Sequence, residues 1–128
     1  MTFRRAGVIG YPVRHSKSPL IHNYWLQKYN IDAVYDTFEI KPEELSEFTA
    51  GLVENGFAGI NVTVPHKVGV MSLMNELSVE AQKAGAVNTV VARLDGTLFG
   101  HNTDGFGFLA NLSESKPDFD VKKSPAVV

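Results

Sequence analysis

The chain has 128 residues, 44% of them hydrophobic and 20% charged, which fits one globular domain with a buried core and excludes a disordered chain. The formal net charge of -2 excludes the strongly basic surface of proteins that bind nucleic acid or anionic membranes. There is no cysteine, which excludes disulfides and thiolate metal sites, and no apolar stretch of signal-peptide or membrane-span length, so we expect a cytoplasmic protein.

The first third of the chain predicts a strand, a helix and a second strand. Residues 6–10 are a short apolar run of the kind found in buried strands. Ser18 and Pro19 predict a helix N-terminus with Ser18 as the N-cap, and Trp25 lies on the apolar face of that helix, which we expect in the core. Residues 33–40 again have a strand pattern.

The middle of the chain continues this alternation. A second helix is expected from Pro42 to Gly56. Residues 60–64 alternate apolar and polar side chains, as in a strand with one polar face, and a helical stretch should follow from Pro65 to about Asn75. Ser78 predicts the N-cap of a further helix that ends near residue 85.

The last third begins with a hairpin. Strand patterns at residues 87–94 and 97–101 flank Asp95-Gly96, a strong signal for a two-residue turn, which would place Asn88 opposite Thr103. A final helix should run from Asp104 to about residue 115, followed by a polar tail. Alternating strands and helices with one hairpin predict a three-layer α/β/α fold with a mixed, mostly parallel sheet.

Three stretches carry residues suited to chemistry. Ser16 and Ser18 follow the first strand and precede a helix N-terminus, an arrangement that suits a small anion. Asn61 and Thr63 share the polar face of a strand, and Lys67 follows in the predicted first helical turn, where the helix dipole disfavours a cation.

The third stretch is the open end of the hairpin, where Asn88 and Asp104 should meet. Structural alternatives remain open at this stage: Ser18 and Asp104 would only cap their helices, and Lys67 would be an ordinary solvated lysine.

Two apparent cofactor signals are rejected. Gly105, Gly107 and Ala110 fit G-x-G-x-x-A, but the preceding Asp104 would repel a pyrophosphate and Phe106 is too bulky for the tight turn. The four histidines lack metal-ligand spacing, so we expect no metal site.

Taken together, the motifs resemble those of the shikimate dehydrogenase family. The matching segments, in the family's order, are Gly10-Tyr11-Pro12, Ser16-Lys17-Ser18-Pro19, Asn61-Val62-Thr63-Val64-Pro65-His66-Lys67, Gly85-Ala86-Val87-Asn88-Thr89 and Gly100-His101-Asn102-Thr103-Asp104-Gly105. The resemblance implies NADP-dependent reduction of 3-dehydroshikimate to shikimate, a step toward aromatic amino acids. It covers nearly the whole chain.

The resemblance also implies roles for individual residues. Ser16 and Ser18 would bind the substrate carboxylate, while Thr63, Asn88 and Asp104 would bind ring hydroxyls, with Asn61 nearby. Lys67 would be the catalytic acid/base, paired with Asp104. A free lysine has a pKa of about 10.4, which desolvation would lower and a neighbouring carboxylate would raise, so the sequence leaves its protonation state open.

The resemblance further implies a division of the chain. Residues 1–103 would form the substrate-binding domain, and residues 104–128 would form a connecting helix, a linker and the start of a strand of a nucleotide-binding domain. NADP would be bound by that missing domain and by no residue here, so the isolated chain is expected to be inactive. A homodimer is left open.

Three alternatives are kept. A dehydrogenase that accepts quinate as well as shikimate would be separated by assaying both acids. A non-catalytic small-acid-binding module of the same fold predicts that Lys67 is dispensable and that no nucleotide domain follows in the reading frame. A pure interaction domain ranks last, because it gains nothing from clustered polar groups.

Overall fold

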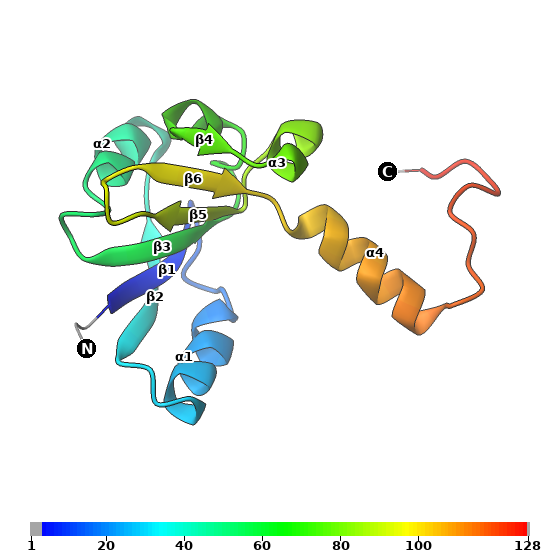
Figure 1. Ribbon diagram of the computed structural model, residues 1–128, viewed down its shortest axis with the longest axis horizontal. Coiled ribbons are helices and arrows are strands. Elements are labelled where there is room, and N and C mark those ends of the chain that lie inside the picture. The colour runs from blue at the N-terminus through cyan, green and yellow to red at the C-terminus, as the bar shows by residue number, and fades with distance from the viewer. Residues whose placement is uncertain (1–3, 128) are drawn as a thin grey trace.

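A computed structural model describes residues 4–127. A six-stranded sheet carries helices on both faces, and one more helix extends away from this body (Figure 1). The strands are β1 (Arg4–Gly10), β2 (Ala33–Glu39), β3 (Phe57–Val62), β4 (Glu76–Leu77), β5 (Thr89–Ala92) and β6 (Leu98–His101). The α-helices are α1 (Ser18–Lys28), α2 (Leu45–Ala50), α3 (Val79–Ala84) and α4 (Asp104–Ser115), and two 3₁₀ helices are η1 (Pro42–Glu44) and η2 (Gly69–Leu73).

The sheet is mixed, in the order β2-β1-β3-β5-β6-β4. Strand β1 pairs in parallel with β2 and β3, whereas β5 is antiparallel to both β3 and β6. The short strand β4, which the sequence did not predict, pairs in parallel with β6. The predicted α/β class with a mixed, mostly parallel sheet is therefore confirmed, and β5 alone runs against the other strands within residues 4–127.

The predicted hairpin is present, but its register differs by one residue. Thr89 pairs with His101, so Asn88 falls opposite Asn102 and not opposite Thr103. The side chain of Asn88 nevertheless reaches Thr103, with 2.8 Å between Asn88 Nδ2 and the Thr103 hydroxyl oxygen.

The hairpin loop explains the shift in register. The backbone N–H of Arg93 donates to the carbonyl of Thr97, which leaves three residues in the loop and not two. Gly96 has a φ of 88°, and the Asp95 carboxylate accepts a hydrogen bond from the Thr97 backbone N–H. A turn closed by a left-handed glycine is the common three-residue hairpin, and Asp-Gly occurs in it as well as in two-residue turns.

The sheet separates two apolar clusters. Alternation along β1 sends Ile9 into the larger cluster, which packs against α2, η2 and α3, and sends Val8 into the smaller one with Val13 and Tyr35, beside Leu26 of α1. The larger cluster contains most of the buried side chains, so it holds the core that fixes the sheet.

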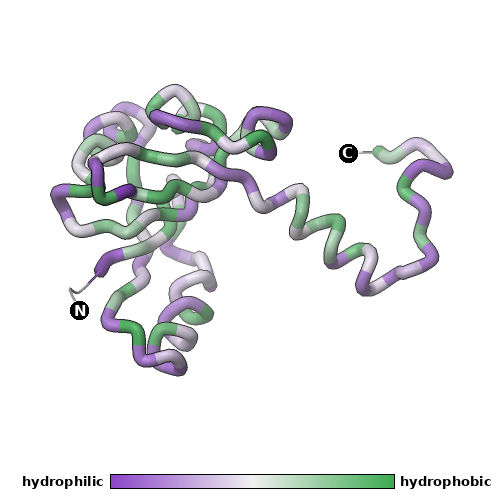
Figure 2. The backbone as a smooth tube through the Cα atoms, viewed as in Figure 1, coloured by the Kyte–Doolittle hydropathy of each residue, from purple (hydrophilic) through white to green (hydrophobic). Residues whose placement is uncertain are grey.

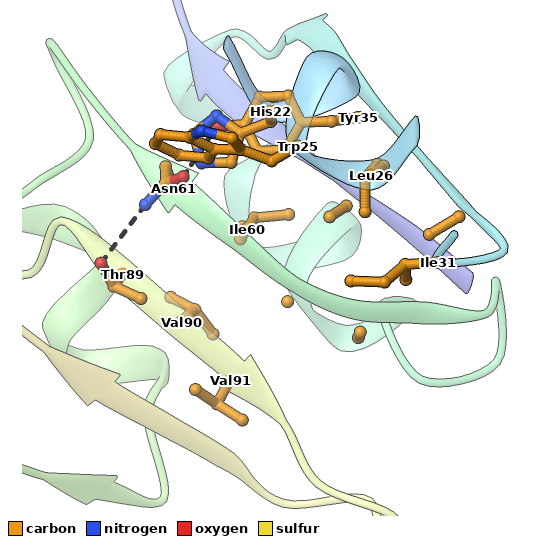
Figure 3. A pocket seen from close by; sticks show the side chains of 14 residues that line it. His22, Trp25, Leu26, Ile31, Tyr35, Ile60, Asn61, Thr89, Val90 and Val91 are labelled. Atoms are coloured by element: carbon orange, nitrogen blue, oxygen red, sulfur yellow. Dashed lines mark hydrogen bonds between the residues drawn. The ribbon is translucent and has the colours of Figure 1, made fainter. Parts of the chain in front are cut away.

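The prediction that Trp25 faces the core is wrong. Its side chain is 47% exposed, and α1 has no buried residue. Helix α1 packs over β2, at one side of the sheet face that it covers. On the same face, β3 and β5 are left beside an open apolar pocket of about 380 Å³, which Trp25 and Leu26 also line (Figure 3). A helix at the rim of a partly uncovered sheet has little for its outer apolar side chains to pack against.

Two further helix predictions have different outcomes. The stretch predicted from Pro65 to Asn75 contains only the short η2, because its valines and Gly69 are poor helix formers. Lys67 therefore lies in a turn before η2, and the argument from an unfavourable helix dipole does not apply to it. The N-cap role of Ser78 is confirmed, since its hydroxyl oxygen accepts from a backbone N–H one turn later at 3.1 Å.

Helix α4 has the predicted bounds and extends away from the sheet, followed by the tail (Figure 1). It carries hydrophobic residues (Figure 2), of which Phe106 and Phe108 are 77% and 70% exposed. Ala126 and Val127, where the start of a strand was expected, form no strand, and Val128 lies outside the described residues. No helix within residues 4–127 is long and apolar enough to cross a membrane.

Gly59 tests the close approach of β3 and β5. A Cβ atom added there would lie 2.4 Å from the backbone carbonyl oxygen of Val90. We expect Gly59→Ala to lower the free energy of unfolding by about 1 to 3 kcal/mol, because the two strands must move apart. In the control Gly107→Ala, the new Cβ meets nothing within 4 Å, and alanine favours a helix. Equal unfolding midpoints for Gly59→Ala and the unsubstituted chain would contradict this prediction.

Candidate active site

The candidate residues gather at one edge of the sheet. Strands β1, β3 and β6 run in the same direction, so their carboxyl ends lie at the same edge. Ser16 and Ser18 follow β1, Thr63 and Lys67 follow β3, and Asp104 follows β6. Residues far apart in the sequence thus reach one edge because of the strand order.

Lys67, Asn88 and Asp104 are in direct contact. The Lys67 amine lies 2.6 Å from Asp104 Oδ2, and Asn88 Nδ2 donates to Asp104 Oδ1 at 3.0 Å. The side chains of Lys67 and Asp104 are 32% and 53% exposed, and an ion pair in so open a place contributes at most about 1 kcal/mol to stability. Folding energy alone therefore does not account for the arrangement.

Asp104 does not cap α4. Its backbone N–H donates to Asn102 Oδ1 at 2.8 Å, while both of its carboxylate oxygens are bound by other side chains. Asn102 is 5% exposed and also donates to the carbonyl of Ala86 at 3.0 Å. The buried Asn102 side chain therefore accepts the hydrogen bond at the start of α4, and the Asp104 carboxylate faces Lys67.

Ser16, Ser18 and Thr63 line a second part of the edge, a pocket of about 410 Å³. The prediction that Ser18 caps α1 is wrong: Ser18 is its first residue, the N-cap is Lys17, and no side chain caps this position. Instead, the Ser16 hydroxyl accepts from the backbone N–H of Ser18 at 3.2 Å. The Ser18 hydroxyl is thus not used as a cap.

Glu39 fixes the loop that carries the two serines. Its carboxylate accepts from the backbone N–H of Val13 at 3.0 Å and of Arg14 at 3.4 Å, and it pairs with the Arg14 side chain at 2.8 Å. The hydrogen bond from Val13, followed by the contacts with Arg14, lowers the pKa of Glu39 below its ordinary 4.5. The end of β2 thereby holds the loop after β1 in place.

Asn61 lies behind this edge, on the face of the sheet that α1 partly covers. Its Nδ2 donates to the Asn88 carbonyl and to the Thr89 hydroxyl, both at 3.3 Å, and its Oδ1 accepts from the Tyr35 hydroxyl at 2.7 Å. The structure therefore connects Asn61 to Asn88.

Sequence reasoning did not single out Glu39, Tyr35 or Thr89. A carboxylate at the end of a predicted strand was a usable signal for Glu39. Tyr35 was recognisable only as a polar side chain in a mostly apolar strand. Thr89 was recognisable only as the residue next to Asn88.

The G-x-G-x-x-A pattern does not form a nucleotide-binding turn. Gly105 and Gly107 lie within the first turns of α4, and an added Cβ at either would meet nothing within 4 Å. No close approach requires glycine there, so the residues do not fit a pyrophosphate. Within residues 4–127, no group of three or more histidine, aspartate or glutamate side chains is arranged to hold a metal ion.

Comparison with known proteins gives consistent matches. Residues 8–90 match the model of the shikimate dehydrogenase substrate binding domain. The shikimate dehydrogenase (NADP(+)) of Rhodospirillum rubrum is 50% identical over 125 residues, which are 98% of this chain and 44% of that protein. This chain thus spans less than half the length of the curated relatives it matches.

Solved structures agree. A shikimate dehydrogenase determined in complex with NADP+ superposes with a TM-score of 0.88 at 38% identity, over 92% of this chain and 41% of that one. The Listeria monocytogenes shikimate 5-dehydrogenase, determined with shikimate and NAD, gives a TM-score of 0.83 at 40% identity, over 88% of this chain and 39% of that one.

The hydrogen bonds of Glu39 to the loop that carries Ser16 and Ser18 predict that the stability of the chain depends on pH. Because the folded pKa of Glu39 is lowered, its stabilising contribution is fully present above the ordinary value of 4.5 and is lost as the pH falls through the lowered pKa. We expect Glu39→Gln to reduce the melting temperature at neutral pH, and the difference from the unsubstituted chain to shrink in acid. Thermal unfolding from about pH 7 to pH 3 measures this.

Glu43→Gln, at an exposed position in η1, is the matched control and should change little at any pH. A melting-temperature difference for Glu39→Gln that stays constant down to the lowest pH would contradict this role of Glu39.

Proposed function

The chain belongs to the shikimate dehydrogenase substrate-binding domain family, and on that premise we propose that it binds shikimate and 3-dehydroshikimate and provides the proton-handling residues for their interconversion. In this proposal, Ser16 and Ser18 bind the carboxylate, while Thr63, Asn88 and Asp104 bind ring hydroxyls with Asn61 behind them. Lys67 is the catalytic acid/base.

The contact of Lys67 with Asp104, at the same end of the sheet as the pocket that Ser16, Ser18 and Thr63 line, is the observation that supports this assignment most directly. A cyclic hydroxy acid needs an anion-binding end and several hydrogen-bonding partners for its ring hydroxyls. The hydroxyls of Ser16 and Ser18 serve the first purpose, and the amide and carboxylate of Asn88 and Asp104 serve the second.

The chemistry assigned to Lys67 follows from the charge that the reaction develops. Reduction of a ketone places negative charge on its oxygen, which an ammonium group stabilises and then protonates. Asp104 holds the Lys67 amine by a hydrogen bond of 2.6 Å, and Asn88 in turn holds the Asp104 carboxylate. The pair is best treated as one proton-handling unit.

We further propose that residues 1–103 act as the substrate-binding domain and that residues 104–128 lead to a second domain that binds NADP. The name of the Rhodospirillum rubrum relative, an NADP(+) enzyme more than twice as long as the matched segment, supports this. When bound, the cofactor supplies the hydride. The exposed apolar residues of α4 are consistent with a segment that is covered in the complete protein.

Binding of the carboxylate is tested on the chain itself. We expect shikimate titrated into the ¹⁵N-labelled chain to shift amide signals of the loop that carries Ser16 and Ser18. Ser16→Ala should weaken binding by about 1 to 3 kcal/mol, because a hydrogen bond to a charged group is lost. Ser113→Ala, on the exposed surface of α4, is the control. An unchanged dissociation constant for Ser16→Ala would argue against the assignment, and titration with quinate measures the preference between the two acids.

The role of Lys67 is tested in a protein that joins this domain to a nicotinamide-binding domain, either the parent gene product or a fusion with that part of the Rhodospirillum rubrum relative. Lys67→Ala should lower kcat by at least about 100-fold while shikimate binding is largely kept. Lys83→Ala, on α3, should retain activity. If Lys67→Ala turns over at the unsubstituted rate, the catalytic assignment is wrong.

The purified 128-residue chain should show no NADP-dependent oxidation of shikimate, because none of its residues is assigned to the cofactor. Absorbance at the wavelength of NADPH measures this directly. A rate that survives further purification would overturn the division of labour proposed for residues 104–128.

A further inference from the structure

Tyr35 lies at the start of a hydrogen-bonded row of side chains that ends at the candidate site. Its hydroxyl donates to Asn61 Oδ1 at 2.7 Å, and Asn61 Nδ2 donates to the Thr89 hydroxyl at 3.3 Å. The Thr89 hydroxyl donates to Asn88 Oδ1 at 2.9 Å, and Asn88 Nδ2 donates to Asp104 Oδ1 at 3.0 Å. Four consecutive bonds therefore connect a buried phenol to the carboxylate that holds Lys67.

The direction of these bonds is fixed by backbone groups at two points. Asn88 Oδ1 accepts from the backbone N–H of Thr103, which only donates, so Asn88 Nδ2 must face Asp104. Asn61 Nδ2 donates to the backbone carbonyl of Asn88, which only accepts, so Asn61 Oδ1 must face Tyr35. The Tyr35 hydroxyl is therefore the donor, and every bond in the row points toward the carboxylate.

Tyr35 itself is held from several sides. Its backbone carbonyl and N–H bond the side-chain amide of Asn23 on α1, at 2.8 and 3.0 Å. The ring of His22 stacks on the Tyr35 ring at a centroid distance of 4.0 Å, and His22 Nδ1 bonds the carbonyl of Ser18 at 2.9 Å. Figure 3 shows these rings beside Asn61, with the bond from Asn61 to Thr89 drawn. A rigid donor fixes the orientation of the group that it binds.

Stability gives no reason for polar groups in this place. Tyr35 is 3% exposed and belongs to an apolar cluster, and the neighbouring pocket is lined by side chains such as Trp25, Leu26 and Val90. Replacing both members of a buried hydrogen-bonded pair with apolar groups of the same shape is often neutral. Burial raises the pKa of Tyr35 to about 12, with a smaller opposing effect of the Ser18 hydroxyl, so the phenol remains a donor at neutral pH.

We propose that Tyr35 is a positioning residue, which fixes the carboxamide of Asn61 and, through Thr89, the orientation in which Asn88 holds Asp104 against Lys67. Its importance for substrate binding rests on the proposed function, whereas the coupling between Tyr35 and Asn88 does not. On the other side, His22 stacks on the Tyr35 ring and bonds the backbone carbonyl of Ser18, so the surroundings of Tyr35 also contact the segment that carries the two serines.

Tyr35→Phe in the 128-residue chain tests the proposal, because phenylalanine fills the same space and lacks only the hydroxyl. With the side-chain amide groups followed by ¹H–¹⁵N NMR, we expect the Nδ2 signals of both Asn61 and Asn88 to shift and to exchange faster with water. The dissociation constant for shikimate should rise roughly 3- to 10-fold. Tyr24→Phe, an exposed tyrosine on α1, is the matched control and should leave both amide signals unchanged.

An Asn88 side-chain signal that is unchanged in folded Tyr35→Phe would overturn the proposal. Thr89→Val interrupts the row at its middle, and it should shift the Asn88 signal even if Tyr35→Phe fails to fold; no shift there would also overturn the proposal. If the unsubstituted chain does not bind shikimate, the proposed function fails, while the amide signals still decide whether Tyr35 orients Asn88.

Discussion

Asn88 uses each of its polar groups to join segments that are distant in the sequence. Its backbone carbonyl accepts from Val62 N–H at 2.8 Å, and its backbone N–H donates to the carbonyl of His101 at 3.0 Å. Its side chain accepts from Thr103 N–H and donates to Asp104. Strand β5 lies between β3 and β6, and this antiparallel insertion puts one amide side chain between the segments that follow those two strands. The geometry of the candidate site depends on that placement.

The site combines a weak interaction with strong supports. The ion pair between Lys67 and Asp104 is too exposed to stabilise the fold appreciably, yet Asp104 is bonded by the buried Asn102 and by Asn88, from which a row of hydrogen bonds leads to the buried Tyr35. A residue that has to exchange protons benefits from solvent access, whereas the groups that orient it benefit from burial, because their bonds then compete less with water. Under the proposed function, these opposite requirements account for an exposed Lys67–Asp104 pair beside a buried Asn102.

The two ends of the site are held by different elements. Glu39, at the end of β2, fixes the backbone of the loop that carries the serines, and α1 begins directly after that loop. The opposite end is held by the β5–β6 hairpin and by the start of α4, whose remaining residues extend away from the sheet (Figure 1). The family match covers residues 8–90, which include Glu39 and Asn88, whereas β6 and α4 lie beyond the matched region.

The sequence alone determined the fold class, the hairpin and the residue types at the site, because strand and helix periods and the Asp95-Gly96 turn are local properties. Its motifs also indicated the family. Only the tertiary structure decided the hairpin register, since two- and three-residue loops share the same turn residues. The tertiary structure alone also showed that Trp25 lies at the rim of a partly uncovered sheet and that Tyr35 reaches Asn61. Burial and side-chain pairing depend on which strands become neighbours, and strand order is not a property of any short segment.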